Sequence, residues 1–236
     1  MTRTDEFRAM HRGPLLVLPN AWDVASARAF AALPGCRAIA TSSAAVARSI
    51  GFEDGEQAPV DEMLRAARRI AAAVDVPVTA DLEAGYGDPP RTAAAALAAG
   101  AAGMNLEDSL QDVELPLDEQ VAIIRAVRAA APSLVLNARV DVFLEGSGAV
   151  DEAVERGNAY LAAGADCVYP IDAPLDAVGA LAAGIDGPVN VLVSPVDPPL
   201  EELARLGVAR VTFGSGLGKV ALDEASRLAA LALSRT

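Results

Sequence analysis

The most informative stretch of the chain reads Val76-Pro-Val-Thr-Ala-Asp-Leu-Glu-Ala-Gly-Tyr-Gly87. Its first part is a short β-branched run, which predicts a buried strand over residues 76–80. Two carboxylates, Asp81 and Glu83, follow two residues apart. Side chains at positions i and i+2 of an extended chain point to the same face, so both acids are expected on one side. Gly85 and Gly87 then turn the chain with little bulk over the acids.

Oxygen ligands that converge at a strand end suit a hard cation such as Mg²⁺ or Mn²⁺. Two neighbouring acids can equally cap a loop, or the helix expected to begin near Pro89. Taken alone, Asp81 and Glu83 do not separate these two interpretations, and the rest of the chain has to decide between them.

Length and composition limit the class of protein. The chain has 236 residues and no linker-like change of composition, so we expect one domain over residues 1–236. Its net charge of −13 argues against nucleic-acid or acidic-membrane partners. The alanine-rich runs are interrupted by glycine and flanked by acids, and the N-terminus lacks an apolar signal core, so no membrane segment is expected. We therefore expect a cytoplasmic protein.

The scarcity of some residue types limits the chemistry. Two cysteines, Cys36 and Cys167, form neither a disulfide framework nor a zinc cluster. The only lysine is Lys219 and the only histidine is His11, so Schiff-base chemistry and a histidine general base are disfavoured. Carboxylates, arginine, tyrosine, hydroxyls, backbone amides and a metal remain as the candidate functional groups.

Short apolar segments alternate with amphipathic segments along the whole chain. The expected strands cover residues 15–18, 37–41, 76–80, 102–107, 134–140, 166–169, 189–193 and 210–213. The expected helices cover residues 2–10, 24–32, 60–73, 90–99, 117–130, 149–162, 175–183, 200–206 and 220–233. Eight such strand–helix units predict a closed (β/α)8 barrel of the TIM type. A doubly wound open sheet is the alternative, but no Gly-x-Gly-x-x-Gly follows the first strand.

The active site of such a barrel lies at the carboxyl ends of the strands. The residues found there are, in chain order, Trp22, Asp23, Ser42, Ser43, Asp81, Glu83, Glu107, Asp108, Arg139, Asp141, Asp172, Asn190, Thr212 and Ser215. Acids on strands three and four, with an arginine on strand five, predict a cation that holds an anionic substrate, whose carboxylate pairs with the guanidinium.

Two alternatives stay open at these strand ends. Arg139 could instead be a structural salt-bridge partner of Glu107 or Asp141. The glycine-rich segment Gly214–Gly218 could cradle a phosphate, as loops after the last barrel strands often do, or form only a tight turn.

Five motifs now stand in order: Pro19-Asn-Ala-Trp-Asp23, Thr41-Ser-Ser-Ala44, Asp81-Leu-Glu-Ala-Gly-Tyr-Gly87, Asn105-Leu-Glu-Asp108 and Asn137-Ala-Arg139. Together they resemble the isocitrate lyase / phosphoenolpyruvate mutase superfamily, over roughly residues 15–213. The resemblance implies a Mg²⁺ enzyme that makes or uses a pyruvate-like enolate, and that cleaves or rearranges a C–C or P–C bond.

The resemblance also implies roles for individual residues. Asp81 would be the principal metal carboxylate, and Glu83, Glu107 and Asp54 would act directly or through water. Arg139 would bind the substrate carboxylate and, with Asp81 and Glu107, form the catalytic set. The 2-oxo acid pocket would be lined by Trp22, Ser42, Ser43, Ala44 and Asn190.

The chain departs from the family pattern in two places. Lyases of the family carry a gating loop, Lys-Lys-Cys-Gly-His, whose cysteine is the acid/base, whereas here Asp108 is followed by Ser-Leu-Gln-Asp-Val-Glu-Leu-Pro, and no asparagine-bearing loop of the mutase type replaces it. The usual Asp-x-Asp is Asp81-x-Glu83, which leads us to expect that Glu83→Asp is tolerated. Many relatives swap a terminal helix between subunits, so the resemblance implies a homo-oligomer, a dimer or tetramer.

We therefore expect a Mg²⁺-dependent enzyme that cleaves a C–C bond of a small 2-oxo or 2-hydroxy carboxylate. Decarboxylation and retro-aldol cleavage are the favoured reactions, and loss of CO₂ suits a site without the cysteine because it needs no acid at the leaving group. One alternative is P–C chemistry of the phosphoenolpyruvate or carboxyphosphonoenolpyruvate mutase type. Another is a barrel that binds a 2-oxo acid but turns it over poorly.

Overall fold

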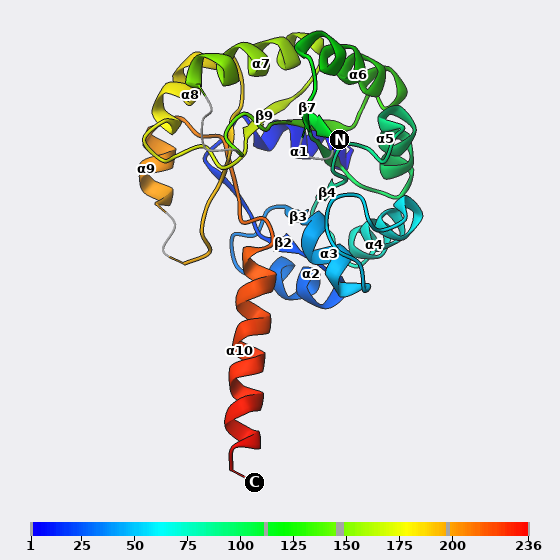
Figure 1. Ribbon diagram of the computed structural model, residues 1–236, viewed down its shortest axis with the longest axis vertical. Coiled ribbons are helices and arrows are strands. Elements are labelled where there is room, and N and C mark those ends of the chain that lie inside the picture. Colours follow the sequence, from blue (N-terminus) through cyan, green and yellow to red (C-terminus); the bar gives the residue numbers. More distant parts are fainter. Residues whose placement is uncertain (1, 111–112, 145–148, 197–198, 236) are drawn as a thin grey trace.

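A computed structural model describes residues 2–110, 113–144, 149–196 and 199–235 of the chain. Helices form a ring around a set of short parallel strands, and the last helix points away from that ring (Figure 1). The larger sheet has six strands in the order β2-β3-β4-β5-β8-β9, and the smaller has the order β1-β11-β10. All pairings within these two sheets are parallel, so the predicted parallel α/β architecture is confirmed.

The strands are short and mostly buried. Those of the larger sheet are β2 (Asn20–Ala21), β3 (Ile39–Thr41), β4 (Val78–Asp81), β5 (Gly103–Leu106), β8 (Val135–Val140) and β9 (Cys167–Pro170). Those of the smaller sheet are β1 (Leu16–Leu18), β10 (Asn190–Leu192) and β11 (Arg210–Thr212). Apolar residues fill most positions of these strands, and polar side chains such as Asn105, Asn137 and Asn190 are buried among them.

The two sheets meet at two junctions. At the first, β1 and β2 are separated only by Pro19, which has no N–H to give to a ladder, although its carbonyl accepts from the amide of Ala40 at 3.1 Å. At the second, Val168 of β9 forms a parallel bridge with Val189, just before β10. Asn20 adds a side-chain clamp at the first junction: it donates to the Thr41 carbonyl at 2.9 Å and accepts from the Phe213 amide at 2.7 Å.

The helices follow the strands in the expected order. They are α1 (Arg3–Met10), α2 (Val24–Ala31), α3 (Ser43–Ser49), α4 (Val60–Ala72), α5 (Pro89–Ala98), α6 (Leu117–Ala130), α7 (Val150–Ala163), α8 (Val178–Gly184), α9 (Leu200–Arg205) and α10 (Gly216–Leu233). Helix α4 shows why they pack as they do. It buries Met63, Ala67 and Ile70, which recur at helical spacing, and it carries Asp61 and Glu62 in its exposed first turn.

Three features differ from the sequence prediction. Helix α3 replaces an expected loop, because the Ser42 hydroxyl caps its N-terminus by accepting from the Ala45 amide at 3.4 Å. Helix α10 begins at Gly216 instead of residue 220, directly after a turn at Gly214 with φ of +52°. A small antiparallel ribbon, β6 (Ser109–Leu110) with β7 (Val113–Glu114), follows β5, and residues 111 and 112 between its strands lie outside the described residues.

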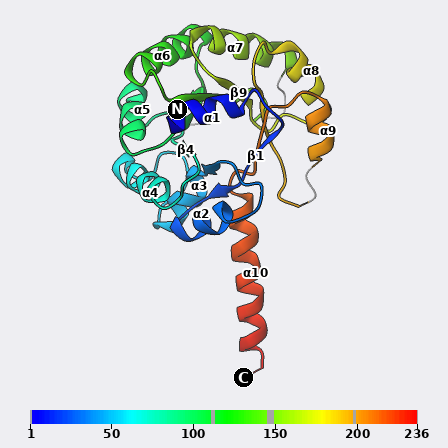
Figure 2. The same cartoon turned by 180° about the vertical axis from the view of Figure 1, so that it is seen from behind.

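The amino-terminal helix covers one end of the ring of strands (Figure 2). Its Phe7 is fully buried among side chains of several strands, including Leu16, Ala40 and Val135. This close approach requires the glycine at position 103, because a Cβ there would lie 2.9 Å from Cε1 of Phe7. The opposite end, where the strands finish, is left for the site. No helix in the described ranges, α10 included, is long and apolar enough to cross a membrane.

Candidate active site

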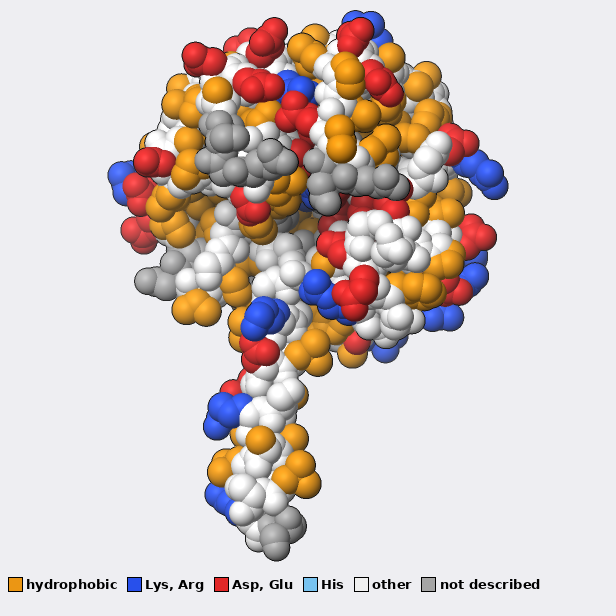
Figure 3. Space-filling model, in the orientation of Figure 1, with side chains coloured by type: hydrophobic (Ala, Val, Ile, Leu, Met, Phe, Trp, Pro, Cys, Tyr) orange, Lys and Arg blue, Asp and Glu red, His pale blue; other side chains and the backbone are white. Residues whose placement is uncertain are grey.

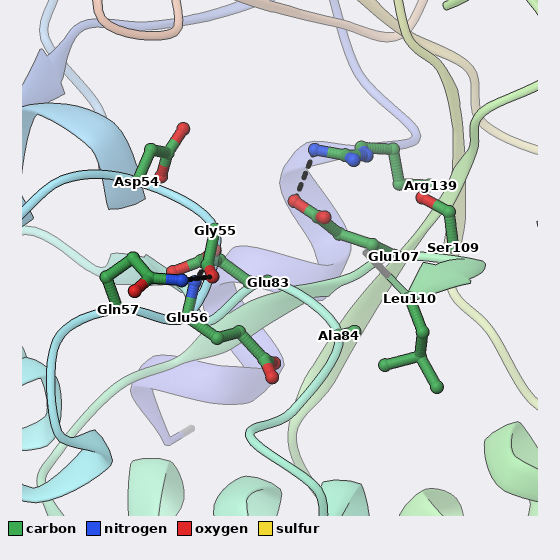
Figure 4. Close-up of a pocket in the computed structure, with 10 residues that line it drawn as sticks. All are labelled: Asp54, Gly55, Glu56, Gln57, Glu83, Ala84, Glu107, Ser109, Leu110 and Arg139. Carbon is green, nitrogen blue, oxygen red and sulfur yellow. Dashed lines mark hydrogen bonds and ion pairs between the residues drawn. The ribbon is translucent and has the colours of Figure 1, made fainter. Parts of the chain in front are cut away.

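Two of the cavities at the carboxyl ends of the strands share Asp54 and Arg139 in their walls. The larger, of about 780 Å³, is lined by Asp54, Gly55, Glu56, Gln57, Glu83, Ala84, Glu107, Ser109, Leu110 and Arg139 (Figure 4). The smaller, of about 180 Å³, includes Ser42, Ser43, Ala44 and Asp81 in its wall. Pockets at this end of parallel strands are where α/β folds bind small molecules.

Asp81 ends β4 and is held from both sides. Its Oδ2 accepts from the Ser43 amide at 2.9 Å, and its Oδ1 accepts from the Asn105 side chain at 3.1 Å. Asn105 is held in turn, because its own oxygen accepts from Asn137 at 2.8 Å. The backbone of Asp81 is also fixed, because its amide donates to the Thr41 hydroxyl at 2.8 Å. The motif asparagines thus orient the carboxylate and leave its remaining lone pairs for another ligand.

Arg139 of β8 forms ion pairs with two buried acids. Its Nε donates to Oδ1 of Asp141 at 2.6 Å and its Nη2 donates to Oδ2 at 2.8 Å, a bidentate pair. Its Nη1 pairs with Glu107 (Figure 4). A guanidinium has five N–H donors, and these contacts use three of them. Arg139 therefore is both a structural salt-bridge partner and a group with two N–H donors to offer a ligand.

Glu107 lies in an unfavourable electrostatic environment. Burial, opposed by Arg139, and then the like charges of Asp81 and Asp141 raise its pKa well above the usual range. Four acids, Asp81, Glu83, Glu107 and Asp141, thus interact around a single guanidinium. Bound positive charge would relieve this repulsion.

A second layer of polar groups fixes Asp141. Asp108, 0% exposed, accepts from the Asp141 amide at 2.9 Å and from the Tyr160 hydroxyl at 2.6 Å. Burial, followed by the charge of Asp141, raises the pKa of Asp108 to about 6. Ser109 hydrogen-bonds to the Asp141 carboxylate. Arg156 of α7 pairs with Asp108 at 3.4 Å and also with Glu114 of the small ribbon. This layer ties the segment after β5 to the residues that hold Arg139.

Glu83 lies apart from Asp81 in its interactions. Its backbone adopts a φ of +50°, beyond the end of β4, so the chain is no longer extended there. Its carboxylate accepts from the Tyr86 hydroxyl and from the Glu56 amide, each at 2.6 Å. Glu56 closes the ring by accepting from the Tyr86 amide at 2.6 Å. Burial raises the pKa of Glu83, although both of these hydrogen bonds lower it.

The sequence led us to expect that Glu83→Asp is tolerated. The hydrogen-bonded ring of Glu83, Tyr86 and Glu56 instead leads us to expect a loss of stability. A shorter side chain cannot reach Tyr86 and Glu56 together, so the substitution is expected to lower the free energy of unfolding by about 1–3 kcal/mol, the cost of leaving buried polar groups unpaired. Urea unfolding measures this cost, and Tyr86→Phe serves as the matched control that removes only the hydroxyl. Equal stability of Glu83→Asp and the unmodified protein would show that the ring contributes nothing.

The structure brings most of the predicted site residues together and leaves two outside. Asp54, Asp81, Glu83, Glu107, Arg139, Ser42, Ser43 and Ala44 line the two cavities. Trp22 lies outside both walls and packs edge-on against Phe30, with its ring 3.3 Å from where a Cβ on Gly218 would sit. Asn190 is fully buried outside both walls and donates to Thr212, which lines the smaller cavity.

Sequence reasoning missed several wall residues. Glu56, Ser109, Tyr169 and Asn20 line the cavities but had no assigned role. Asn20 belongs to the Pro19-Asn motif and Ser109 directly follows Glu107-Asp108, so their positions in the sequence could have indicated them. Glu56 gave no such signal, because it reaches the site through a loop turn with φ of +58°.

The donor set fits a divalent cation of the Mg²⁺ type. No group of three His, Cys, Asp or Glu side chains within the described ranges is close enough to form a ready cage. Mg²⁺ usually keeps several waters and takes only one or two carboxylates, so it needs no such cage. Asp81, with unused lone pairs, and Asp54, which lines the same cavity, supply hard oxygens of the right type.

The chain is similar in sequence to known proteins. A sequence profile of the phosphoenolpyruvate phosphomutase family matches residues 7–233. An uncharacterized protein of Mycobacterium tuberculosis is 37% identical over 208 residues, covering 87% of this chain and 80% of its own. Oxaloacetate decarboxylase of Chromohalobacter salexigens is 32% identical, and the match covers 81% of this chain and 70% of the relative. 2-Methylisocitrate lyase of Bacillus subtilis is 33% identical, and the match covers 70% of this chain and 58% of the relative.

The chain is also similar in fold to solved structures. One from Burkholderia cenocepacia J2315, provisionally assigned as a phosphonomutase, is 40% identical with a TM-score of 0.89 over 98% of both chains. Oxaloacetate acetylhydrolase in complex with oxalate is 25% identical with a TM-score of 0.86, over 99% of this chain and 87% of its own. With the five motifs assembled at one end of the strands, these matches place the chain in the isocitrate lyase / phosphoenolpyruvate mutase superfamily.

Proposed function

We propose that the protein is a Mg²⁺-dependent lyase that cleaves a C–C bond of a small 2-oxo or 2-hydroxy carboxylate through a pyruvate-like enolate. The observation that carries this proposal is that Asp81 and Arg139 both line one small cavity. The Asp81 carboxylate is oriented by two hydrogen bonds and has lone pairs left for a ligand. The Arg139 guanidinium is oriented by Asp141 and has N–H donors left for a ligand. An anion that also ligates a cation fits between such groups.

The residues of the chain would position the substrate in defined ways. The two remaining N–H donors of Arg139 would hold the substrate carboxylate, and the bidentate pair with Asp141 would keep that fork from rotating. Mg²⁺, when bound at Asp81, would supply positive charge where the enolate oxygen develops. Ser43 and Asn105 would keep the Asp81 carboxylate aimed.

Decarboxylation is the reaction that this site supports best. In a 2-oxo diacid whose second carboxylate is attached to carbon 3, the bond between carbon 3 and that carboxylate breaks, CO₂ leaves, and the electron pair remains as the enolate. Solvent then protonates carbon 3. The step needs no thiol acid, which agrees with the cysteines: Cys167 is fully buried within β9 and Cys36 lies before β3, both outside the walls of the two cavities. Similarity to an oxaloacetate decarboxylase supports the same choice.

The proposal includes a closed eight-stranded barrel. Two observations support closure: the single-residue interruption between β1 and β2, and the bridge from Val168 to Val189. In a closed barrel the strand ends form one rim, which would bring β1, β3, β4, β5 and β8 to a common site.

A steady-state assay against a panel of 2-oxo diacids and 2-hydroxy diacids, with and without Mg²⁺, tests the proposal. We expect Mg²⁺-dependent release of CO₂ or of an aldehyde or 2-oxo acid fragment. If the protein turned over no compound of the panel, the lyase proposal would be contradicted, and a barrel that binds a 2-oxo acid without turnover would remain. Similarity to a structure provisionally assigned as a phosphonomutase favours mutase chemistry as the second candidate, and phosphorus NMR of a phosphonate substrate would reveal it.

We also propose a homo-oligomer, because α10 stands clear of the rest of the protein (Figure 3). Every residue from 219 to 235 is exposed, including Leu222, Leu228 and Leu231, and Gly218 is the buried residue of this helix. An amphipathic helix is stabilised mainly by packing, so this one is expected to lie against a second subunit.

The oligomer is expected to depend on these leucines. The double substitution Leu222→Glu, Leu228→Glu should convert a dimer or tetramer into monomers, because it places charge on the apolar surface of α10. Light scattering coupled to gel filtration measures the mass. Ala230→Glu, at an exposed position on the other side of the helix, provides a control for an added charge alone. A monomeric unmodified protein would contradict the proposal.

A further inference from the structure

A charged side chain lies deep inside the ring of strands, beneath the candidate site. Arg210 begins β11 and is 0% exposed. It is two residues before Thr212, which lines the smaller cavity, so both side chains point to the same face of the strand. Its guanidinium carbon lies 6.0 Å from the centre of the Phe7 ring of α1. Arg210 therefore sits between the floor of the site and the helix that covers the opposite end.

The guanidinium has no hydrogen-bond partner among the described residues. Its Nε, Nη1 and Nη2 are all buried and all lack an acceptor. Five other buried atoms among the described residues also lack a hydrogen-bond partner: Nε2 of His11, Oγ1 of Thr79, Oε1 of Gln120, Oδ1 of Asn137 and Nε of Arg156. A guanidinium offers five donors, and leaving even one buried polar group unpaired costs about 1–3 kcal/mol, with more for a charged group. A native protein rarely leaves such a group without an ion or water.

The neighbouring side chains do not neutralise Arg210. Burial raises the pKa of the nearby Cys167 to about 12 and raises that of Tyr169, so both are uncharged near neutral pH. Asp81 is the nearby acid, and Ser43 and Asn105 already hold its carboxylate at the carboxyl end of β4.

Asp166, the acid near His11, does not neutralise Arg210 either, because it already pairs with two other arginines. Asp166, which acts on His11, pairs with Arg8 at 2.7 Å and with Arg128 at 2.6 Å. His11 adds no negative charge, because its Nδ1 hydrogen-bonds the Phe7 carbonyl and burial, followed by the charge of Arg210, lowers its pKa to about 4.

We infer that Arg210 binds a small inorganic anion, of the chloride class, inside the barrel between the site floor and α1. A monatomic anion accepts several N–H donors at once and neutralises the guanidinium, which water alone cannot do. Phe7 over the guanidinium and the complete burial of Arg210 leave no exposed route for a large organic anion. The anion is separate from the substrate, because Arg210 does not belong to the walls of the two cavities of the candidate site.

Bromide provides a direct probe of this site. Crystals of the full chain grown in sodium gluconate would be transferred to 100 mM sodium bromide, and anomalous scattering would locate the ion. We expect a peak within about 3.5 Å of a guanidinium nitrogen of Arg210, the range of a hydrogen bond to a large anion. Absence of a peak there, with density for water alone, would overturn the inference.

Melting measurements test the same site in solution. Because a ligand that binds only the folded state stabilises it by mass action, the Tm should rise by about 3–5 °C for each tenfold increase of chloride above its Kd, at ionic strength kept constant with gluconate. Arg210→Met should lose this rise, and the exposed Arg205→Met should keep it. Equal Tm values of the unmodified protein in chloride and gluconate would contradict the inference. If Arg210→Met does not fold, the bromide crystal and the unmodified protein still decide the matter.

Discussion

Replacing Asp81 with alanine is expected to abolish binding of Mg²⁺ and to lower kcat/KM by about 10³ or more. The carboxylate is the one acid in the smaller cavity that two neighbours orient while its lone pairs stay available. Loss of the cation removes several kcal/mol of stabilisation from the developing enolate oxygen, and each 1.4 kcal/mol is about tenfold in rate. Calorimetry with Mg²⁺ in the presence of a 2-oxo acid measures the binding, and a steady-state assay measures the rate.

Asp75→Ala provides the matched control. Asp75 precedes the same strand, its side chain is exposed, and its ion pair with Arg3 is long at 3.9 Å. It should retain full binding and activity. Near-UV circular dichroism establishes that Asp81→Ala is folded. A folded Asp81→Ala protein that binds Mg²⁺ as tightly as the unmodified protein would place the metal elsewhere.

Replacing Arg139 with lysine is expected to weaken binding of a small dicarboxylate by about 100-fold or more, although the formal charge is unchanged. Lysine is a point charge and cannot keep the bidentate pair with Asp141, the pair with Glu107 and two further donors for substrate together. It would also leave Glu107 and Asp141 without part of their neutralising partner, and truncating a buried charge pair costs about 2–5 kcal/mol. Oxalate titration measures the loss.

The exposed Arg125→Lys serves as control for the substitution itself and should bind oxalate normally. Retention of oxalate affinity within about threefold by Arg139→Lys would mean that Arg139 serves only its two acidic neighbours. In that case the substrate carboxylate must be held by another group.

The parallel α/β architecture could be predicted because it rests on periodicity. Short β-branched runs such as Val76 to Ala80 became strands, and the amphipathic runs between them became helices. Features that depend on one capping contact or one missing donor were not predicted. Helix α3 depends on the Ser42 hydroxyl, and the break between β1 and β2 depends on Pro19.

The site was predicted where its residues end strands and not where the chain leaves the strand. Asp81 ends β4 and Arg139 lies within β8, so their positions follow from the parallel register. The expectation that Asp81 and Glu83 share a face assumed an extended chain, but Glu83 has a left-handed backbone and turns into the ring with Tyr86 and Glu56. A pattern of residues cannot reveal such a change of backbone.

The partners of Arg139 were left open for a different reason. A sequence can show that Glu107 and Asp141 end neighbouring strands, but whether a guanidinium pairs with both or is free for substrate depends on side-chain geometry. The structure shows that it pairs with both and still has two donors. The unpartnered Arg210 was likewise not apparent, since its burial follows from the position of α1 over the strands.

Binding of oxalate, pyruvate and inorganic phosphate with and without Mg²⁺ is the measurement that tests the central claim most directly. Oxalate is planar and dianionic and matches the carboxylate and enolate oxygens of pyruvate enolate, so a site complementary to that intermediate should bind it more tightly than pyruvate. We expect isothermal titration calorimetry to show that oxalate binds more tightly than pyruvate, and that oxalate binding is lost when Mg²⁺ is removed. Phosphate binding that is independent of Mg²⁺, together with indifference to oxalate, would contradict the account and point to the glycine-rich segment Gly214–Gly218 instead.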